Sequence, residues 1–248
     1  TTTQSPTMPT QPIGPAGRSW LSANLWWLSL AVGFVLVLLL NRYDAGVAQA
    51  ISADRLPGDV RRELHAWQQY GQGTATVMLC LVVWLMDPRN RPRLFDYGLC
   101  IIITGAAVSL LKGLIGRPRP KYNDPETFLG PLGMYPVTPD GRTEPFLAHA
   151  WDITKPISSD LWSMPSSHTA FAVLMSVFIV WLYPRLAIPA VFLAAAVAFA
   201  RMLFDAHWMT DVIAGAAIAI SVGSLVMGGR WISRRLESRY SAGASRAG

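Results

Sequence analysis

Charged residues are scarce in this sequence. Asp, Glu, Lys and Arg together make up 15% of its 248 residues, whereas an ordinary soluble domain has about 25%. Hydrophobic residues make up 52% of the chain and include ten tryptophans. This composition argues against an ordinary soluble domain. Because the apolar residues are clustered into long runs, it indicates an integral membrane protein.

Cysteine is also scarce, with two residues in the chain. Cys80 and Cys100 both fall within long apolar runs, where a thiol is usually buried and inert. Two such cysteines give no framework of disulfide bonds. Charge is missing altogether from the first 17 residues, TTTQSPTMPTQPIGPAG, which are rich in Pro, Thr and Gly. We therefore expect residues 1–18 to form a disordered tail.

Long apolar runs dominate the remainder of the chain. They cover residues 21–40, 70–86, 94–115, 165–183, 186–204 and 211–228. Each run has roughly the 17–25 residues that a helix needs to cross about 30 Å of hydrocarbon. Backbone polar groups must be satisfied inside a bilayer, so these runs are predicted to be helices. The sequence predicts an all-α integral membrane fold, a six-transmembrane-helix bundle spanning residues 19–229.

Arginine positions predict the topology of this bundle. Arg89, Arg91 and Arg93 lie in one short loop, Arg185 lies in another, and a basic tail at residues 230–248 follows the last run. Positive residues favour the cytoplasmic side, so both termini are expected in the cytoplasm. The first run is then a retained anchor, and a long non-cytoplasmic loop at residues 121–164 joins the third and fourth helices. Topology accounts for these basic residues, so we expect no nucleic-acid partner.

Five ionisable residues remain that topology does not explain. They lie near the ends of the predicted spans: Lys112, His168, Arg201, His207 and Asp211. Alternation of helix direction places all five at the same, non-cytoplasmic face of the membrane. Ionisable groups at such depth are costly, so they are candidates for function.

The segment KGLIGRPRP suggests an anion site. Lys112 and Arg119 are seven residues apart, and the prolines at 118 and 120 prevent the helix from continuing. Two cations held together suit an anion with several oxygens, such as phosphate. The alternative is a set of basic side chains that reach from a helix end to the membrane surface, a role that suits Arg117 and Lys121 in particular.

The segment PSSH begins the fourth apolar run. Pro165 fits the first turn of a helix and Ser163 is a candidate cap. The free backbone N–H groups of such a turn form an anion site, to which Ser166 adds a hydroxyl donor. His168 is placed to deliver a proton to a bound anion. An ordinary capped membrane helix with a histidine at its end is the alternative.

His207 and Asp211 are four residues apart and share a helix face if the helix includes both. A carboxylate on one imidazole nitrogen fixes the tautomer and leaves the other nitrogen as a base or nucleophile. A structural His–Asp pair is one alternative. A metal site built from His168, His207 and Asp211 is another, but nearby cations would repel a metal ion, so we expect none.

These three segments resemble the type 2 phosphatidic acid phosphatase family. Its pattern is Lys-x6-Arg-Pro, then Pro-Ser-x-His, then Arg-x5-His-x3-Asp. The chain matches that order and spacing with Lys112 to Pro120, Pro165 to His168, and Arg201 to Asp211. The resemblance covers about residues 94–228. Family members often have glycine at the position of Ser167 and serine at the position of Ala200.

The resemblance implies a mechanism. His207 would attack phosphorus to form a phosphohistidine, Asp211 would orient the imidazole, and His168 would protonate the leaving oxygen and then activate water. The phosphate oxygens would be held by the remaining candidates: Lys112, Arg119, Ser166, Ser167 and Arg201. Phosphoryl transfer depends mostly on positioning and charge stabilisation, so we expect no metal ion and no cofactor.

The family's substrates are lipid phosphates, including phosphatidic acid, phosphatidylglycerol phosphate, isoprenyl pyrophosphates, sphingolipid phosphates and lipid A phosphates. We therefore expect a lipid phosphatase. Arg outnumbers Lys eighteen to three, which favours a bacterial source, so the site is expected to face the periplasm or exterior of a bacterial cytoplasmic membrane. The loop at residues 121–164 is expected to act as a lid or a substrate-selecting wall. A lipid phosphotransferase with the same site and a non-catalytic protein that binds anionic lipids are the alternatives.

Overall fold

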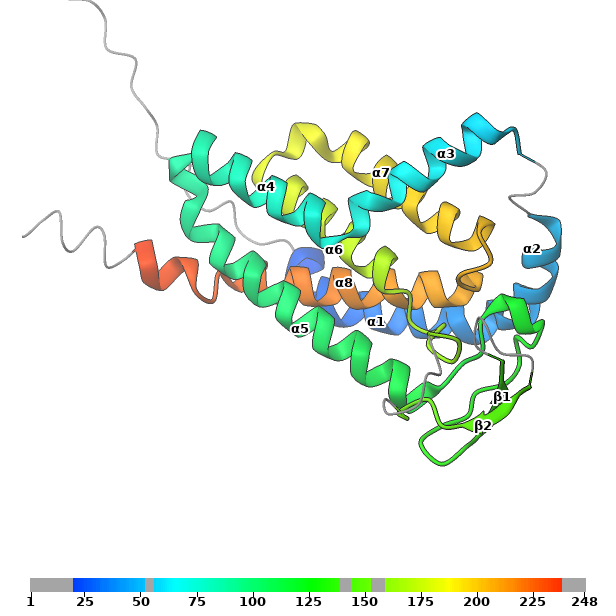
Figure 1. Ribbon diagram of the computed structural model, residues 1–248. Coiled ribbons are helices and arrows are strands. Elements are labelled where there is room, and N and C mark those ends of the chain that lie inside the picture. Colours follow the sequence, from blue (N-terminus) through cyan, green and yellow to red (C-terminus); the bar gives the residue numbers. More distant parts are fainter. Residues whose placement is uncertain (1–19, 52–55, 139–143, 153–158, 238–248) are drawn as a thin grey trace, which may run out of the picture.

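The computed structural model describes residues 20–51, 56–138, 144–152 and 159–237. The predicted tail at residues 1–18 and the end of the basic tail, residues 238–248, lie outside the described residues. Within the described ranges the helices are α1 (Trp20–Leu40), α2 (Asp44–Ala50), α3 (Gly58–Trp67), α4 (Gly73–Met86), α5 (Arg91–Ile115), α6 (Ser167–Leu182), α7 (Ala187–Leu203) and α8 (Met209–Gly229). Figure 1 shows their arrangement as a bundle.

Four helical stretches of the described chain are long and apolar enough to cross a membrane: Ala23–Ala50, Pro88–Ile115, Pro184–Leu203 and Met209–Glu237. The helices α4 and α6 are apolar but shorter, at 14 and 16 residues. The predicted spans were longer because they included Tyr70, which lies in a 3-10 turn, and Ser166, whose extended backbone precedes α6. Six membrane crossings therefore stay a prediction.

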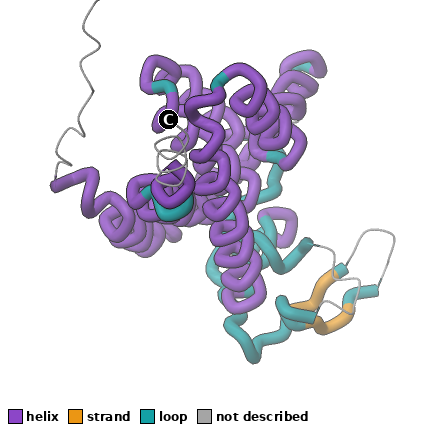
Figure 2. Tube along the Cα trace, turned by 90° about the vertical axis from the view of Figure 1, so that its left-hand side faces the viewer, coloured by secondary structure: helices purple, strands orange, loops and turns teal. Residues whose placement is uncertain are grey.

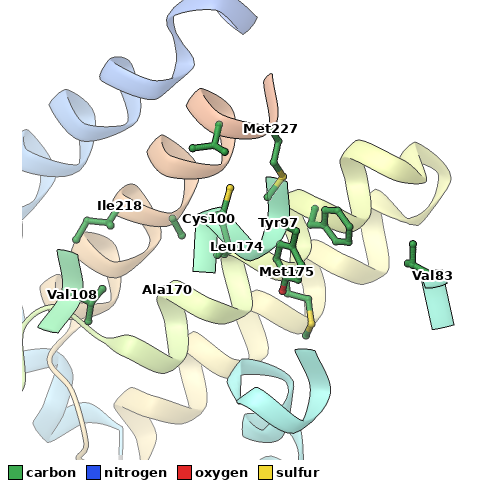
Figure 3. Close-up of a cluster of buried hydrophobic side chains, with 12 residues drawn as sticks. Val83, Tyr97, Cys100, Val108, Ala170, Leu174, Met175, Ile218 and Met227 are labelled. Carbon is green, nitrogen blue, oxygen red and sulfur yellow. The ribbon is translucent and has the colours of Figure 1, made fainter. Parts of the chain in front are cut away.

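Helix α8 lies at the centre of the bundle, packed against α1, α5 and α6. Gly33 on α1 allows one of these contacts, because a Cβ atom there would lie 2.4 Å from the Cβ of Ala217. Small residues that let helix backbones approach closely are typical of membrane interfaces. The main core lies between α5, α6 and α8, where Tyr97 stacks on Phe178 with ring centroids 4.2 Å apart. Figure 3 shows this core.

The segment between α5 and α6 corrects the all-α prediction. It contains two antiparallel strands, β1 (Tyr135–Val137) and β2 (Phe146–Ala148), with Tyr135 opposite Ala148. Figure 2 shows the strands beside the helices rather than among them. They enclose a small core of their own with Ala150 and Leu161. The role of this loop as a lid or a substrate-selecting wall stays a prediction.

The predicted arginine loops gather at one end of the bundle. Tyr183, after α6, donates a hydrogen bond to Asp87, after α4, at 2.8 Å. The guanidinium of Arg93, in the first turn of α5, lies 5.0 Å from the ring centroid of Trp181 in the last turn of α6. We call this region the arginine end. The opposite ends of α5, α6, α7 and α8 hold the candidate site.

Candidate active site

The structure brings the predicted site residues together from four helix ends. Lys112 lies in the last turn of α5, His168 in the first turn of α6, and Arg201 in the last turn of α7. His207 lies in the link before α8, and Asp211 in the first turn of α8. The charges of Lys112, Arg119 and Arg201 act on His168, and those of Lys112 and Arg201 also act on His207. We call this region the catalytic end.

Direct contacts join the segment before α6 to the start of α8. The N–H of Ser166 donates to the carbonyl oxygen of Asp211 at 3.0 Å. The hydroxyl of Ser163 donates to Asp211 Oδ2 at 2.5 Å. Gly215, one turn further along α8, permits this approach, because a Cβ there would lie 2.5 Å from the carbonyl oxygen of Ser166. The two histidine-bearing segments are therefore held side by side by backbone as well as side-chain contacts.

His207 is buried and its ring orientation is fixed. Its Nδ1 lies 2.6 Å from the carbonyl oxygen of Ser163, which can only accept a hydrogen bond, so Nδ1 carries a proton. In the neutral ring Nε2 then carries the lone pair. Burial lowers the pKa of His207 to about 4, which favours the neutral ring at physiological pH. The side chain is thus arranged as a base or nucleophile.

Asp211 differs in part from the predicted geometry. Its Oδ2 lies 3.8 Å from His207 Nδ1, beyond hydrogen-bond distance, and the backbone carbonyl of Ser163 takes that place. The carboxylate is fully buried, and it accepts hydrogen bonds from the Trp208 N–H at 2.8 Å and from Ser163. It acts on the imidazole through its charge and through Ser163. The spacing of four residues gave no sign of this intervening residue.

The start of α6 is shifted from its predicted position. Ser166, not Ser163, is the N-cap, and its side chain accepts hydrogen bonds from the N–H and the hydroxyl of Thr169. Ser167 is the first helical residue, so its N–H belongs to the unpaired first turn, as expected of an anion site. His168 follows, half-buried, with Nε2 3.4 Å from Gln72 Nε2.

The three basic side chains among the predicted phosphate ligands, Lys112, Arg119 and Arg201, are half-buried, and within the described residues none of them forms an ion pair with a carboxylate. Lys112 Nζ donates to the carbonyl oxygen of Trp162 at 2.9 Å, and Arg201 Nη1 donates to Gln68 Oε1 at 2.7 Å. The Nε atoms of Arg119 and Arg201 are buried without a hydrogen-bond partner in the described structure. Positive charge is therefore concentrated here, although the charges of Asp160 and Asp211 act on Arg119 and that of Asp211 acts on Lys112. Such a cluster of cations suits a dianion.

Several residues at the catalytic end were missed or misread in the sequence. Arg117 was expected to be a membrane-surface residue but is fully buried, whereas Lys121 pairs with Asp160 at 2.7 Å and is half-exposed. Gln68 and Gln72 lie outside the three motifs. The sequence marks them only as amide side chains at the start of an apolar run. Within the described residues, no cluster of three or more His, Cys, Asp or Glu is arranged to hold a metal ion.

An apolar groove of about 780 Å³ runs between α6, α7 and α8. Thr169 and Val212 line it at the catalytic end, and Trp181 and Arg230 line it at the arginine end. The groove begins beside the site, because Thr169 also donates a hydrogen bond to Ser166 at 3.0 Å.

The PAP2 superfamily model matches residues 93–235, more than half of the chain and every predicted motif. The chain belongs to the PAP2 superfamily. The comparison with curated proteins returns no match. The matched range of this PAP2 protein begins after α4, so Gln68, Gln72 and the helices α1 to α4 lie outside it.

Two solved structures share the fold. One is described as the first transmembrane PAP2-type phosphatidylglycerolphosphate phosphatase from Bacillus subtilis, with a TM-score of 0.53, 16% identity, and coverage of 86% of this chain and 96% of that one. The other is LpxE from Aquifex aeolicus, with a TM-score of 0.50, 17% identity, and coverage of 71% and 89%. With its apolar helices, this PAP2 protein is an integral membrane protein.

Proposed function

We propose that this PAP2 protein is a membrane lipid phosphatase that hydrolyses a phosphomonoester or pyrophosphate headgroup. The observation that carries the proposal is the meeting of His207, His168 and three clustered cations at one end of the bundle. Membership of the superfamily and the folds of the two neighbours support it. A binding protein would need the cations but has no use for a buried neutral imidazole beside them.

The proposed reaction has two steps through a phosphohistidine. His207 Nε2 attacks phosphorus, the bond from phosphorus to the ester oxygen breaks, and His168 gives its proton to the leaving oxygen. A water molecule then gives a proton to His168 and attacks phosphorus, the P–N bond breaks, and phosphate leaves. His168 must begin protonated. Burial and the charges of Arg201, Lys112 and Arg119 oppose this, and the negative charge of the bound phosphate has to offset them.

The remaining residues stabilise the charge of the transferred group. Lys112, Arg119 and Arg201 supply the cations, and Ser166 and the N–H of Ser167 supply further donors. Donors fixed in place before the reaction are the usual source of the largest rate enhancement. The fixed Nδ1 contact to Ser163 supports the role of His207 Nε2, and the charge of Asp211 stabilises the imidazole as it becomes positive.

The lipid is proposed to bind with its headgroup at the catalytic end and one hydrocarbon chain in the groove between α6, α7 and α8. The groove is apolar and begins beside Ser166, where the phosphate would lie. The proposed topology has six crossings, cytoplasmic termini, and the catalytic end at the outer face of a bacterial cytoplasmic membrane. The arginine end supports this orientation.

Phosphate release by the purified protein tests the function. We expect release from at least one lipid in a panel of phosphatidic acid, phosphatidylglycerol phosphate, an isoprenyl pyrophosphate and a lipid A phosphate. His207→Ala should lower it by at least about a thousandfold. His149→Ala is the control, because His149 binds the carbonyl of Gly133 in the loop instead. No release from any lipid, or full activity in His207→Ala, would contradict the proposal. Product analysis with an added alcohol would reveal phosphotransfer.

A further inference from the structure

Arg117 is a buried arginine that the proposed reaction does not use. Its side chain is 0% exposed, although it lies in the polar link after α5. Its Nη1 donates to Asp211 Oδ1 at 2.7 Å and to the hydroxyl of Thr210 at 2.8 Å. Its Nη2 donates to Asp44 Oδ2 at 2.8 Å and to Asn41 Oδ1 at 2.7 Å. One guanidinium therefore joins the region between α1 and α2 to the start of α8.

Asp44 is the second carboxylate of this group and is also fully buried. Its Oδ1 accepts a hydrogen bond from the N–H of Thr210 at 3.1 Å, and its Oδ2 accepts one from the Thr210 hydroxyl. Asp44 thus holds the first turn of α8, next to Asp211, as well as Arg117. It begins α2, far outside the range that matches the superfamily model.

Arg117 also contacts both groups that face the imidazole of His207. Its side chain binds Asp211, and its carbonyl oxygen accepts the N–H of Ser163 at 3.1 Å. The carbonyl oxygen of Ser163 in turn accepts a hydrogen bond from the Nδ1–H of His207. A displacement of Arg117 would therefore move both groups that orient His207, namely the charge of Asp211 and the carbonyl acceptor of Ser163.

We infer that Arg117 and Asp44 are positioning residues, which set the charge and orientation of Asp211 and Ser163 and so tune His207. The inference rests on the proposed role of His207 as nucleophile. Neither residue contacts the reacting atoms. The segment of α1 and α2 is then part of the catalytic machinery and not only a membrane anchor.

The charges of Arg117 and Asp44 predict that replacing each residue has the opposite effect on the protonation of His207. The charged groups facing His207 are Lys112 from α5, Arg201 from α7 and Asp211 from α8. Arg117 partly neutralises Asp211, so its loss would leave more negative charge near His207 and stabilise the imidazolium. The loss of Asp44 would leave Arg117 less neutralised and destabilise the imidazolium. A purely structural role gives no reason for opposite signs.

The test compares Arg117→Gln, Asp44→Asn and the double variant in detergent. In Arg117→Gln the acid limb of the kcat/KM profile should move up by about one pH unit, and in Asp44→Asn it should move down by a similar amount. The double variant should return near the wild-type position, because the charge changes cancel. Each single variant should lose about tenfold in kcat with little change in KM.

Asp96→Asn is the matched control. Asp96 is a fully buried carboxylate at the arginine end and accepts the N–H of Ile232 at 2.7 Å. This variant should leave the acid limb in place. Equal shifts in the same direction for Arg117→Gln and Asp44→Asn, or no shift in either, would overturn the inference.

A second measurement separates this inference from the proposed function. Imidazole NMR titration, with the His207 signal assigned by its loss in His207→Gln, reports the same opposite shifts without turnover. Shifts of the expected sign in a protein that releases no phosphate would support the positioning network and contradict the phosphatase. Should Arg117→Gln fail to fold, the direction of the shift in Asp44→Asn decides. Thr210→Val removes the hydroxyl between Arg117 and Asp44, and it should lower kcat without moving the acid limb of the kcat/KM profile.

Discussion

The two ends of the bundle both hold clustered basic residues, but their carboxylates are paired differently. At the arginine end, the charges of Asp87, Asp96 and Glu237 act on Arg93, and Arg230 pairs with Glu237. At the catalytic end, within the described residues, Asp211 pairs with Arg117 and Asp160 pairs with Lys121. The side chains of Lys112 and Arg201 bind a carbonyl and an amide oxygen, and the charges of the two paired carboxylates still act on Arg119. The difference indicates that cations alone do not mark a phosphate site. Cations whose neighbouring carboxylates are already paired with other basic side chains do.

Arg201 gives the largest contrast between the two ends. Arg201→Gln should lower kcat/KM by about a hundredfold, because it removes a fixed donor and a charge from the transferred phosphate. Arg185→Gln, in the exposed turn between α6 and α7, should change it little. Steady-state kinetics on the best lipid measures both. Equal losses of kcat/KM in Arg201→Gln and Arg185→Gln would contradict the contrast between the catalytic end and the arginine end.

The pH dependence sharpens the contrast through His207. Its pKa is lowered to about 4 by burial, so the neutral ring that the proposed attack needs persists as the pH falls and is lost only as the pH drops through that range. The acid limb of kcat/KM should therefore lie well below the ordinary histidine value of about 6.5. Below the limb, activity should fall about tenfold for each pH unit. An acid limb at or above pH 6.5 would contradict this state of His207.

Gln68 tests whether the tether of Arg201 matters. Gln68→Ala removes the amide oxygen that accepts from Arg201 and should lower kcat/KM by about tenfold, the equivalent of one hydrogen bond to a charged group. Gln69→Ala, at the exposed neighbouring position, should have no effect. Full activity in Gln68→Ala would show that Arg201 is held without it.

The groove should give the smallest and most selective effect. Ala195 lines the groove, so Ala195→Phe should raise KM for a long-chain lipid by several fold, about the energy of displacing one methylene. Hydrolysis of a soluble phosphate ester should not change. Ile188→Phe, on an exposed position of α7 outside the groove, is the control. An equal rise in KM for the lipid and the soluble ester would mean that the hydrocarbon chain of the lipid does not bind in this groove.

The sequence was most informative where chemistry and topology agree. Helices of alternating direction bring residues 112, 168, 201 and 211 to one end of a bundle. This arrangement follows from the positions and order of the apolar runs in the sequence. The two strands in the loop, the short α4, and the N-cap at Ser166 did not follow, because they depend on local backbone geometry. Arg117 was misread because a surface arginine and a buried one look alike until their partners are known. Asp44 and Gln68 were missed since their partners lie 73 and 133 residues away.

The glycine at position 215 has a consequence for how far this site tolerates change. The smallest possible side chain there, one methyl group, would collide with the backbone just ahead of α6. That backbone leads into His168, the proposed proton donor, and the first turn of the helix of Gly215 contains Asp211, which supports His207, the proposed nucleophile. The spacing between the two halves of the reaction thus depends on the absence of a single carbon atom, at a position that bears no chemistry of its own.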